Sequence, residues 1–397
     1  MTVSRLRGIP PTIFAEMSAL ATATGAINLG QGFPDVDGPA DVVERAVAAL
    51  RGGANQYAPG PGVPVLREAV ARHQQRHYGL DLDPATQVVI TTGATEAIAA
   101  AILGLVEPGD EVVLLEPYYD SYPAMITMAG GVRRPVTLRA PDFRLDVAAL
   151  RSAVSERTRV ILLNTPHNPT GTVLTRAELQ AVADVAVEHD LIVVTDEVYE
   201  HLTYGTGTHH NEHHPLATLP GMFERTLTLS SIGKSYSFTG WKVGWASGPA
   251  HLVAAVLAAK QWLTFTSGAP LQPAAAYALD EEPDWPARLA ASLQERRDLL
   301  CEGLRALGLA VTVPQGTYFA TTDITGLGWA DGDAFCRALP GRAGVVAIPT
   351  QGFYDPDRDA ADNPGRQLVR WAFCKRPEVV ETALERLAGS DLSGPRG

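Results

Sequence analysis

The sequence predicts an α/β protein with a mostly parallel central sheet flanked by helices, and a smaller α/β domain beside it. Two patterns in the middle of the chain support this prediction. Short runs of consecutive apolar residues recur, which is typical of strands buried on both faces of a parallel sheet. Segments with helical periodicity lie between these runs, so strand, helix and strand follow one another as in βαβ units.

The apolar runs are expected to form the strands of the large sheet. Their ranges are 87–92, 111–116, 160–165, 191–196, 226–231 and 243–248. The helical segments between them include TEAIAAAILGLV at residues 95–106 and RAELQAVADVAVEHD at residues 176–190.

The pattern changes after residue 283. A long helix is expected over DWPARLAASLQERRDLLCEGLRAL, with Asp284 as its N-cap and Pro286 in its first turn. Short strand-like runs follow, namely AVTVP, TYFATTDI, GVVAIP and QLVRWAF. We therefore predict a large domain over residues 48–283, and a small domain formed by residues 1–47 together with residues 284–397.

Composition is that of a globular protein, since 46% of the 397 residues are hydrophobic and 19% are charged. The 32 basic and 44 acidic residues give a net charge of −12. This balance argues against nucleic acid or an anionic membrane as partner, because both need a basic surface. The three cysteines are widely spaced, and we recognise no signal peptide and no membrane span. We expect a cytoplasmic protein that acts on small molecules.

A histidine-rich stretch, HHNEHH, occupies residues 209–214. Four histidines could hold a metal ion, but the Gly and Thr residues before them favour a solvated loop. We expect a loop here and assign no metal site.

Polar motifs follow several predicted strands, at the edge where open α/β sheets bind ligands. TTGATEA, residues 91–97, passes from a strand through a glycine into a helix, so the N–H groups of Ala94 and Thr95 would face an anion. NTPHNPTG, residues 164–171, contains two prolines and two asparagines, which favour a rigid binding loop. Each motif alone also fits an ordinary turn.

Acidic and basic side chains occupy two further strand ends. Asp196 ends the run LIVVTD, where a buried carboxylate needs a partner, and Tyr199 follows three residues later. A helix-capping role for Asp196 is the alternative. SSIGKSYSFTGWKVGWASG, residues 230–248, holds Lys234 and Lys242 but no acidic residue.

An amine in a poorly charged pocket can have its pKa lowered, which makes it a nucleophile toward aldehydes. Pyridoxal phosphate combines an aldehyde, a phosphate and a ring nitrogen. The aldehyde would react with Lys234. The phosphate would bind the turn at 93–95 and Lys242, and the ring nitrogen would pair with Asp196.

Six segments of the chain, in this order and nearly from end to end, resemble the class I/II pyridoxal-phosphate aminotransferases of fold type I. The segments are NLGQGFPDVDGP, NQYAPGPG, NTPHNPTG, TDEVYEHL, SSIGKSYSFTGWKVGW and LVRWAFCK. Within this family the chain is similar to the branch of kynurenine, glutamine and methionine aminotransferases. It is most similar to actinobacterial-type N-succinyldiaminopimelate aminotransferases, through EPYYDSY, GATEAIAAAILGLVEPGDEV and FAEMSALAT.

The resemblance implies a role for each matching residue at the cofactor. Lys234 would form the Schiff base with pyridoxal 5′-phosphate and move the substrate proton, and Asp196 would pair with the ring nitrogen. Tyr199 and Asn168 would hydrogen-bond the phenolic oxygen, and Tyr119 would stack on the ring. The residues implied at the phosphate are Ala94, Thr95, Ser231 and Lys242.

The resemblance also implies a substrate site and a homodimer. Arg370 would clamp the substrate α-carboxylate, with Gly32 and Asn168 beside it. In this family the active site lies between two subunits, and Tyr57 would reach the phosphate of the neighbouring site.

Some positions depart from the kynurenine-directed pattern. Thr95 stands where several such relatives carry an aromatic residue, and Thr266 stands where some have a histidine from the partner subunit. His167 replaces an asparagine. These differences remove part of an aromatic substrate wall, so they favour a donor other than kynurenine.

The implied reaction moves an amino group from an amino acid to an oxo acid, with 2-oxoglutarate as the expected acceptor. N-succinyl-LL-2,6-diaminopimelate is the preferred donor, and kynurenine, glutamine and methionine are alternatives. A cysteine-conjugate β-lyase would share the fold and the cofactor. A cofactor-binding transcriptional regulator would need a DNA-binding domain, which we do not expect here.

Overall fold

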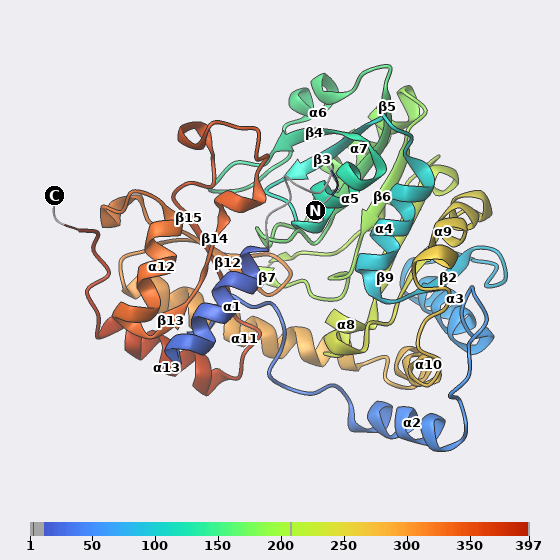
Figure 1. The fold of residues 1–397 in the computed structure, drawn as a ribbon, viewed down its shortest axis with the longest axis horizontal. Coiled ribbons are helices and arrows are strands. Elements are labelled where there is room, and N and C mark those ends of the chain that lie inside the picture. Colours follow the sequence, from blue (N-terminus) through green and yellow to red (C-terminus); the bar gives the residue numbers. More distant parts are fainter. Residues whose placement is uncertain (1–2, 4–11, 207–208, 396–397) are drawn as a thin grey trace.

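The structure, a computed structural model, describes residue 3, residues 12–206 and residues 209–395. A larger part surrounds one central sheet (Figure 1). A smaller part combines the orange to red C-terminal elements with the dark blue N-terminal helix.

In the described part of the chain the large sheet has seven strands, in the order β2-β10-β9-β6-β5-β3-β4. The strands are β2 (Val88–Thr91), β3 (Glu111–Glu116), β4 (Val132–Thr137), β5 (Thr158–Asn164), β6 (Ile192–Asp196), β9 (Thr226–Ser231) and β10 (Gly244–Ser247). Neighbouring strands are parallel, except that β10 runs antiparallel to both β2 and β9.

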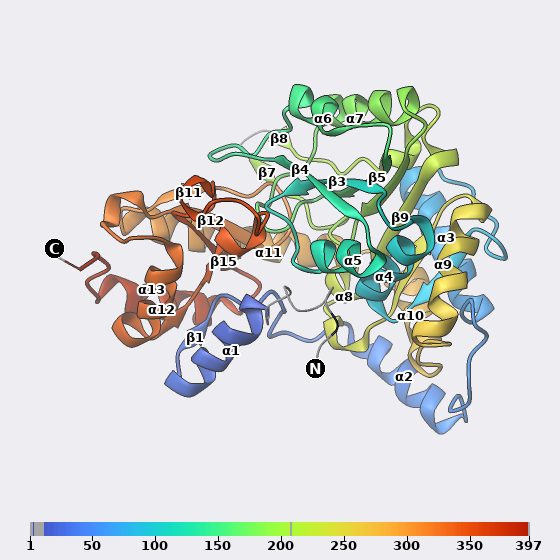
Figure 2. The same ribbon diagram turned by 45° about the horizontal axis from the view of Figure 1, so that its top comes forward.

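Both faces of this sheet are buried, which explains the continuous apolar runs. Along β3, Val112 and Leu114 belong to one hydrophobic core, and Val113 and Leu115 belong to another. Helices α4 (Gly93–Leu105), α5 (Ser121–Ala129) and α9 (Ala250–Leu263) contribute to the first core, and α6 (Val147–Ala153) and α7 (Arg176–Glu188) to the second. Figure 2 shows α6 and α7 on the face of the sheet opposite α4 and α5.

A third group of helices packs against β2 and β10. These are α2 (Ala40–Arg51), α3 (Pro64–Tyr78) and α10 (Leu271–Glu281), whose shared core includes Ile90 and Trp245. Helix α3 has Pro64 in its first turn and ends at Gly79, whose φ of 71° is the left-handed conformation that glycine adopts readily.

The smaller part is a four-stranded antiparallel sheet with helices packed on it. Its strand order is β11-β12-β15-β14, for β11 (Ala310–Thr312), β12 (Phe319–Asp323), β15 (Leu368–Ala372) and β14 (Ile348–Pro349). The helices are α11 (Trp285–Ala306), α12 (Gly332–Ala343) and α13 (Pro377–Ala388).

The N-terminal segment joins this smaller part. Helix α1 (Ile13–Thr24) contacts α12, and β1 (Ile27–Asn28) pairs in parallel with β13 (Val345–Val346). The figures show α1 beside the C-terminal elements in both views. The boundaries at residues 48 and 283 stay predictions.

The predicted strands of the large sheet coincide with observed strands to within two residues at each end. Two features differ from expectation. β10 is antiparallel, and β4 was not among the predicted strands, because VRRPVT is an edge strand whose two arginines and proline interrupt any continuous apolar run. No helix in the described ranges is long and apolar enough to span a membrane.

The histidine-rich stretch is less exposed than a solvated loop would be. The structure places β8 (His209–His210) opposite β7 (Gly205–Thr206). His213 is buried, and its Nε2 lies 2.9 Å from Glu197 Oε2. The expectation of a fully solvated loop is therefore wrong for His213, since a buried carboxylate partner holds its ring. The side chains of His209 and His210 lie outside the described set.

Candidate active site

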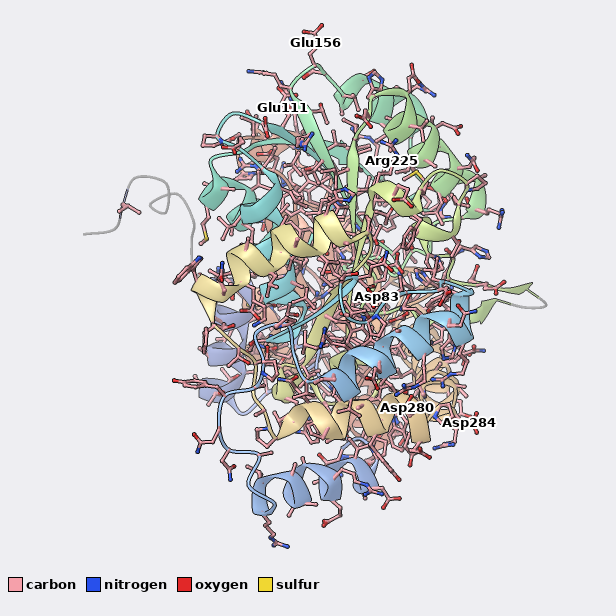
Figure 3. All side chains as sticks on the ribbon, turned by 90° about the vertical axis from the view of Figure 1, so that its right-hand side faces the viewer. Asp83, Glu111, Glu156, Arg225, Asp280 and Asp284 are labelled. Atoms are coloured by element: carbon pink, nitrogen blue, oxygen red, sulfur yellow. The ribbon has the colours of Figure 1, made fainter. Side chains whose placement is uncertain are left out.

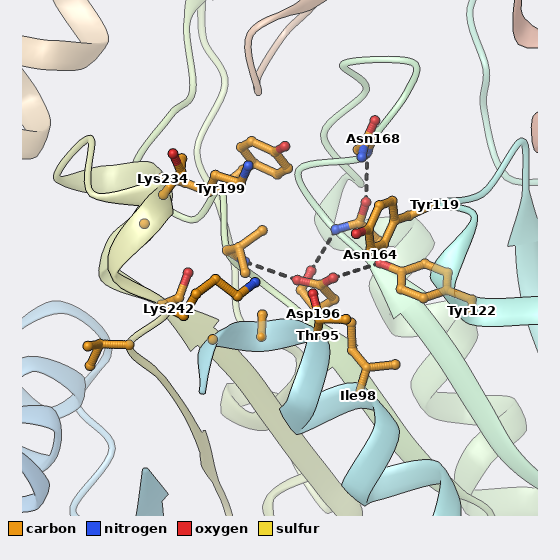
Figure 4. A pocket seen from close by; sticks show the side chains of 17 residues that line it. Thr95, Ile98, Tyr119, Tyr122, Asn164, Asn168, Asp196, Tyr199, Lys234 and Lys242 are labelled. Atoms are coloured by element: carbon orange, nitrogen blue, oxygen red, sulfur yellow. Dashed lines mark hydrogen bonds between the residues drawn. The ribbon is translucent and has the colours of Figure 1, made fainter. Parts of the chain in front are cut away.

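A cavity opens at the carboxyl ends of the parallel strands, where the sequence motifs meet (Figure 4). Strand register brings the motifs together, because Asn164 at the end of β5 pairs with Asp196 at the end of β6. Nine residues predicted from the sequence line this cavity, namely Ala94, Thr95, Tyr119, Asn168, Asp196, Tyr199, Ser231, Lys234 and Lys242.

Lys234 lies on the short helix α8 (Ile232–Ser235), which begins directly after β9. Its Nζ donates to the Tyr318 hydroxyl at 2.8 Å and lies 3.4 Å from the Gly32 carbonyl oxygen. The Tyr318 hydroxyl in turn donates to the same carbonyl. Burial lowers the pKa of Lys234 to about 8, against a smaller opposing effect of Asp196. The amine is therefore partly neutral near pH 7.

Asp196 is buried and has two hydrogen-bond donors. Its Oδ2 accepts from the Tyr122 hydroxyl at 2.7 Å, and its Oδ1 accepts from the Val198 N–H at 3.3 Å. Burial raises the pKa of the Asp196 carboxyl to about 6, although both hydrogen bonds oppose this shift. The residues after Asp196 form a turn and not a helix, so a helix-capping role does not apply.

Asparagines fix the loop beside Asp196. Asn164 donates from Nδ2 to the Asp196 carbonyl at 2.8 Å, and its Oδ1 accepts from the Asn168 N–H at 2.7 Å. Figure 4 shows these bonds as a chain from Asn168 through Asn164 to Asp196 and Tyr122. The predicted loop therefore has its position set by side-chain amides.

Two aromatic rings border the cavity. Tyr119 contacts Tyr122 edge to face, at 5.7 Å between ring centroids. Tyr199 contacts Tyr318 in the same way at 5.3 Å, and burial raises the pKa of its hydroxyl above the ordinary range. Lys234 Nζ lies 5.6 Å from the centre of the Tyr199 ring.

The start of α4 forms a cradle with the Lys242 amine. The helix begins at Gly93, and the Thr92 side chain does not cap it, so its first N–H groups have no side-chain acceptor there. The first residues of the helix line the cavity. Gly93 has a φ of 72°, and a Cβ there would come within 3.2 Å of Lys242 Nζ. Backbone donors, a helix N-terminus and an ammonium group together suit a phosphate.

Arg370 on β15 lies next to this cavity but is not among its lining residues. Its Nη1 donates to Asn168 Oδ1 at 3.0 Å, and its Nη2 donates to the Gly30 carbonyl at 2.8 Å. The guanidinium carbon lies 3.9 Å from the centre of the Phe319 ring. Burial lowers the pKa of Arg370 to about 10, so the side chain stays charged.

The structure brings Gly32 to Lys234 but leaves Tyr57 outside the site. Tyr57 is 83% exposed and packs edge to face on Phe265, at 5.3 Å between ring centroids. Thr266 follows Phe265, and its hydroxyl lies 3.4 Å from the carbonyl oxygen of Pro59, which comes two residues after Tyr57.

Three site residues were not predicted from the sequence. Tyr122 and Asn164 lie inside motifs that were singled out, EPYYDSY and NTPHNPTG, and Asn164 is the last residue of β5, so these motifs could have indicated both residues. Tyr318 carries no such signal, because it comes from the smaller part of the molecule, 84 residues from Lys234.

The residues present fit pyridoxal phosphate. A buried carboxylate with a raised pKa suits a cationic ring nitrogen, because a positive partner would offset the cost of its burial. A partly neutral lysine amine faces the same cavity, and the uncapped helix start and Lys242 suit a phosphate.

Comparison with known proteins agrees with this chemistry. The model of the family described as aminotransferase class I and II matches residues 24–387. The chain belongs to this family. The aminotransferase therefore depends on pyridoxal phosphate, and its α/β architecture is that of fold type I.

Individual relatives are similar over almost the whole length. The aminotransferase is 54% identical to a probable N-succinyldiaminopimelate aminotransferase DapC of Mycobacterium tuberculosis, over 98% of both chains. It is 40% identical to a methionine aminotransferase of Escherichia coli, over 97% of both chains. A solved N-succinyldiaminopimelate aminotransferase structure from M. tuberculosis superposes with a TM-score of 0.94 at 53% identity, covering 98% of this chain and all of that one.

Proposed function

We propose that this aminotransferase uses N-succinyl-LL-2,6-diaminopimelate as amino donor and 2-oxoglutarate as acceptor, as a step of lysine biosynthesis. The observation that carries the proposal is the 54% identity, over 98% of both chains, to a relative named for that donor. The E. coli relative named for methionine is 40% identical, and it makes methionine the second candidate donor.

We assign the cofactor contacts to the residues that line the cavity. Bound pyridoxal phosphate supplies an electron sink that takes up the electron pair left when the substrate Cα proton is removed. The Asp196 carboxylate would hold the ring nitrogen in its charged form, and Tyr122 would orient that carboxylate through its 2.7 Å hydrogen bond. Tyr199 and Asn168 would donate to the phenolic oxygen, and Tyr119 would cover one ring face.

The phosphate would lie at the start of α4. The N–H groups of Ala94 and Thr95 would donate to its oxygens, together with the Ser231 hydroxyl and the Lys242 ammonium group. All four residues line one cavity, which supports a shared ligand.

Lys234 would move the substrate proton as general base and then general acid. Its lowered pKa of about 8 leaves the amine able both to take up and to release a proton near neutral pH. While no cofactor is bound, Tyr318 and the Gly32 carbonyl hold Nζ in place through contacts of 2.8 and 3.4 Å.

Arg370 would bind the substrate α-carboxylate. Its guanidinium already faces Asn168 through a 3.0 Å hydrogen bond, and the Phe319 ring supports its plane. A planar fork of N–H donors matches a carboxylate in a bidentate way that a lysine does not. The Gly32 and Asn168 groups beside it would complete the carboxylate site.

A homodimer with shared active sites would complete the phosphate site. The exposed aromatic side chains Tyr57, Trp262 and Phe265 are 83%, 83% and 55% exposed, and an apolar group of this kind is typical of an interface. Tyr57 would reach the phosphate of the partner's site. We also place the protein in the cytoplasm, which accords with the three free and buried cysteines.

The donor assignment is tested by comparing kcat/KM for several amino donors with 2-oxoglutarate as acceptor. The panel is N-succinyl-LL-2,6-diaminopimelate, methionine, glutamine and kynurenine. We expect the first to exceed each of the others by about tenfold or more, which corresponds to about 1.4 kcal/mol of transition-state binding. A higher value for methionine would contradict the assignment. Release of pyruvate from a cysteine conjugate without any acceptor would indicate a β-lyase.

A further inference from the structure

Two histidines of helix α3 meet a third from a distant part of the chain, and none of the three lines the cofactor cavity. His73 and His77 lie one helical turn apart on α3, so they share one face of it, and His201 lies in the turn that follows β6. Their ring centroids are 4.5, 4.8 and 5.0 Å apart, which is close to an equilateral triangle. Figure 3 shows α3, in blue, near the surface beside the helix that carries Asp280.

We propose that His73, His77 and His201 form a binding site for a divalent transition-metal ion of the zinc type. One ring nitrogen from each histidine lies within 4.8 Å of the others. Around a tetrahedral zinc ion with Zn–N distances of about 2.0–2.1 Å, ligand nitrogens are about 3.3 Å apart. Small rotations of the three side chains would therefore reach ligand geometry without movement of the backbone.

The charge state of the cluster suits a metal ion. His73 Nε2 and His201 Nε2 are 2.7 Å apart, so at most one of these two nitrogens carries a proton. The neutral imidazole, which predominates above the ordinary histidine pKa of about 6.5, is the form that binds metal ions.

Gln74 supplies an independent observation. Its side chain is buried, and its Oε1 has no hydrogen-bond partner among the described residues. Its Nε2 lies 3.4 Å from His73 Nδ1. A half-turn of the amide would place Oε1 against Nδ1, so that Nδ1 carries the proton and Nε2 is free for a metal ion. Metal-bound histidines generally have such an acceptor on the other ring nitrogen.

The site is accessible and lies close to the catalytic segment. His73 is buried, His201 is half-buried and His77 is exposed, so an ion can enter at His77 and keep water at a fourth position. His201 comes two residues after Tyr199 and five after Asp196. A bound ion would therefore join α3 to the turn that presents these two residues to the cofactor.

The test is calorimetric titration of the untagged, cofactor-loaded protein with ZnCl₂, supported by the visible spectrum of the Co²⁺ complex. We expect one ion per chain. The variants His77→Ala, at an exposed position, and His201→Asn should each weaken binding by about 100-fold or more, since losing an outer-shell partner alone costs about 10–100-fold. Zn²⁺ should also raise the melting temperature of the parent protein but not of either variant.

A matched control removes the other histidine-rich stretch, as His209→Ala/His210→Ala/His214→Ala. The proposal predicts that this variant binds Zn²⁺ as the parent does, with the same Co²⁺ spectrum. It is overturned if the parent binds no ion, or if the control variant loses the ion while His77→Ala and His201→Asn keep it.

Discussion

Lys234 loses most of its hydration in the folded chain, and its pKa of about 8 reflects that loss. Only the neutral amine attacks an aldehyde, so the capture of pyridoxal phosphate by the cofactor-free protein should depend on pH. The second-order rate of capture, followed by absorbance, should rise with pH and level off above about 8. A rise with a midpoint near 10.5, the ordinary value for lysine, would contradict the description of this pocket.

Tyr318 should influence the same titration. Its hydroxyl donates to the Gly32 carbonyl, so it offers a lone pair to Lys234 Nζ and stabilises the charged amine. In Tyr318→Phe the midpoint of cofactor capture should move down by about one pH unit, because a hydrogen bond to a charged group contributes about 1.5–3 kcal/mol and part of it is regained from water. A purely structural role for Tyr318 would leave the midpoint unchanged.

Asp196 should destabilise the cofactor-free protein. Its folded-state pKa of about 6 exceeds the ordinary 3.8, so the stability it contributes is present at low pH and is lost as pH rises through about 6. Asp196→Asn removes this effect. The free energy of unfolding of the variant, relative to the parent, should therefore increase between pH 4 and pH 7.5 by up to about 3 kcal/mol.

Urea unfolding of both cofactor-free proteins at the two pH values measures this difference. The same variant should lose about 100-fold or more in kcat, because the amide cannot neutralise a cationic ring nitrogen. A pH-independent difference in stability between variant and parent would contradict the assigned pKa.

Sequence reasoning could place residues that stand at the ends of recognisable strands, and their roles at the cofactor stay predictions. Lys234, Asp196 and Asn168 follow strands that are recognisable as continuous apolar runs, and parallel strands bring their carboxyl ends to one edge. Tyr318 and the His73 cluster depend on contacts between segments 84 and 128 residues apart. No local pattern encodes such contacts, so they appear only when the elements are packed.

At the scale of elements, the turn between β2 and α4 should be sensitive to substitution at Gly93. Gly93→Ala would place an L-residue at a φ of 72° and a methyl group 3.1 Å from Lys242 Cε. We expect a loss of about tenfold or more in pyridoxal phosphate affinity, measured by equilibrium dialysis.

Gly25→Ala is the matched control for this substitution. Gly25 also has a positive φ, 65°, but a Cβ there would meet nothing within 4 Å. The control should cost a similar backbone strain, about 1–2 kcal/mol of stability, and leave cofactor affinity unchanged. Equal losses of affinity in the two variants would show that strain alone acts, and that the Lys242 contact does not matter.

The element that sequence reasoning missed shows the limit of the apolar-run criterion. β4 lies at the edge of the sheet and is partly buried, and its VRRPVT sequence has the arginines and the proline that edge strands tolerate. The antiparallel direction of β10 could not be predicted from its apolar run, because a buried strand has the same apolar pattern whichever way it runs.

At the scale of the whole molecule, the exposed group of Tyr57, Trp262 and Phe265 predicts association. Sedimentation equilibrium should give twice the chain mass of 42.2 kDa, that is, 84.4 kDa. Trp262→Ser/Phe265→Ser should shift the equilibrium toward the monomer and weaken cofactor binding. Val187→Ser, at an exposed apolar position on α7, should do neither. A parent protein that is monomeric at micromolar concentration would contradict the shared-site proposal.

The central claim is that this aminotransferase works through Lys234, and it is tested most directly by the absorbance of the cofactor-loaded protein. Glutamate is added without an acceptor, and 2-oxoglutarate is added afterwards. We predict that glutamate bleaches the visible cofactor band, that 2-oxoglutarate restores it, and that Lys234→Ala shows neither change. If the parent protein forms no visible cofactor band, or if Lys234→Ala bleaches and recovers as the parent does, the assignment of Lys234 is wrong.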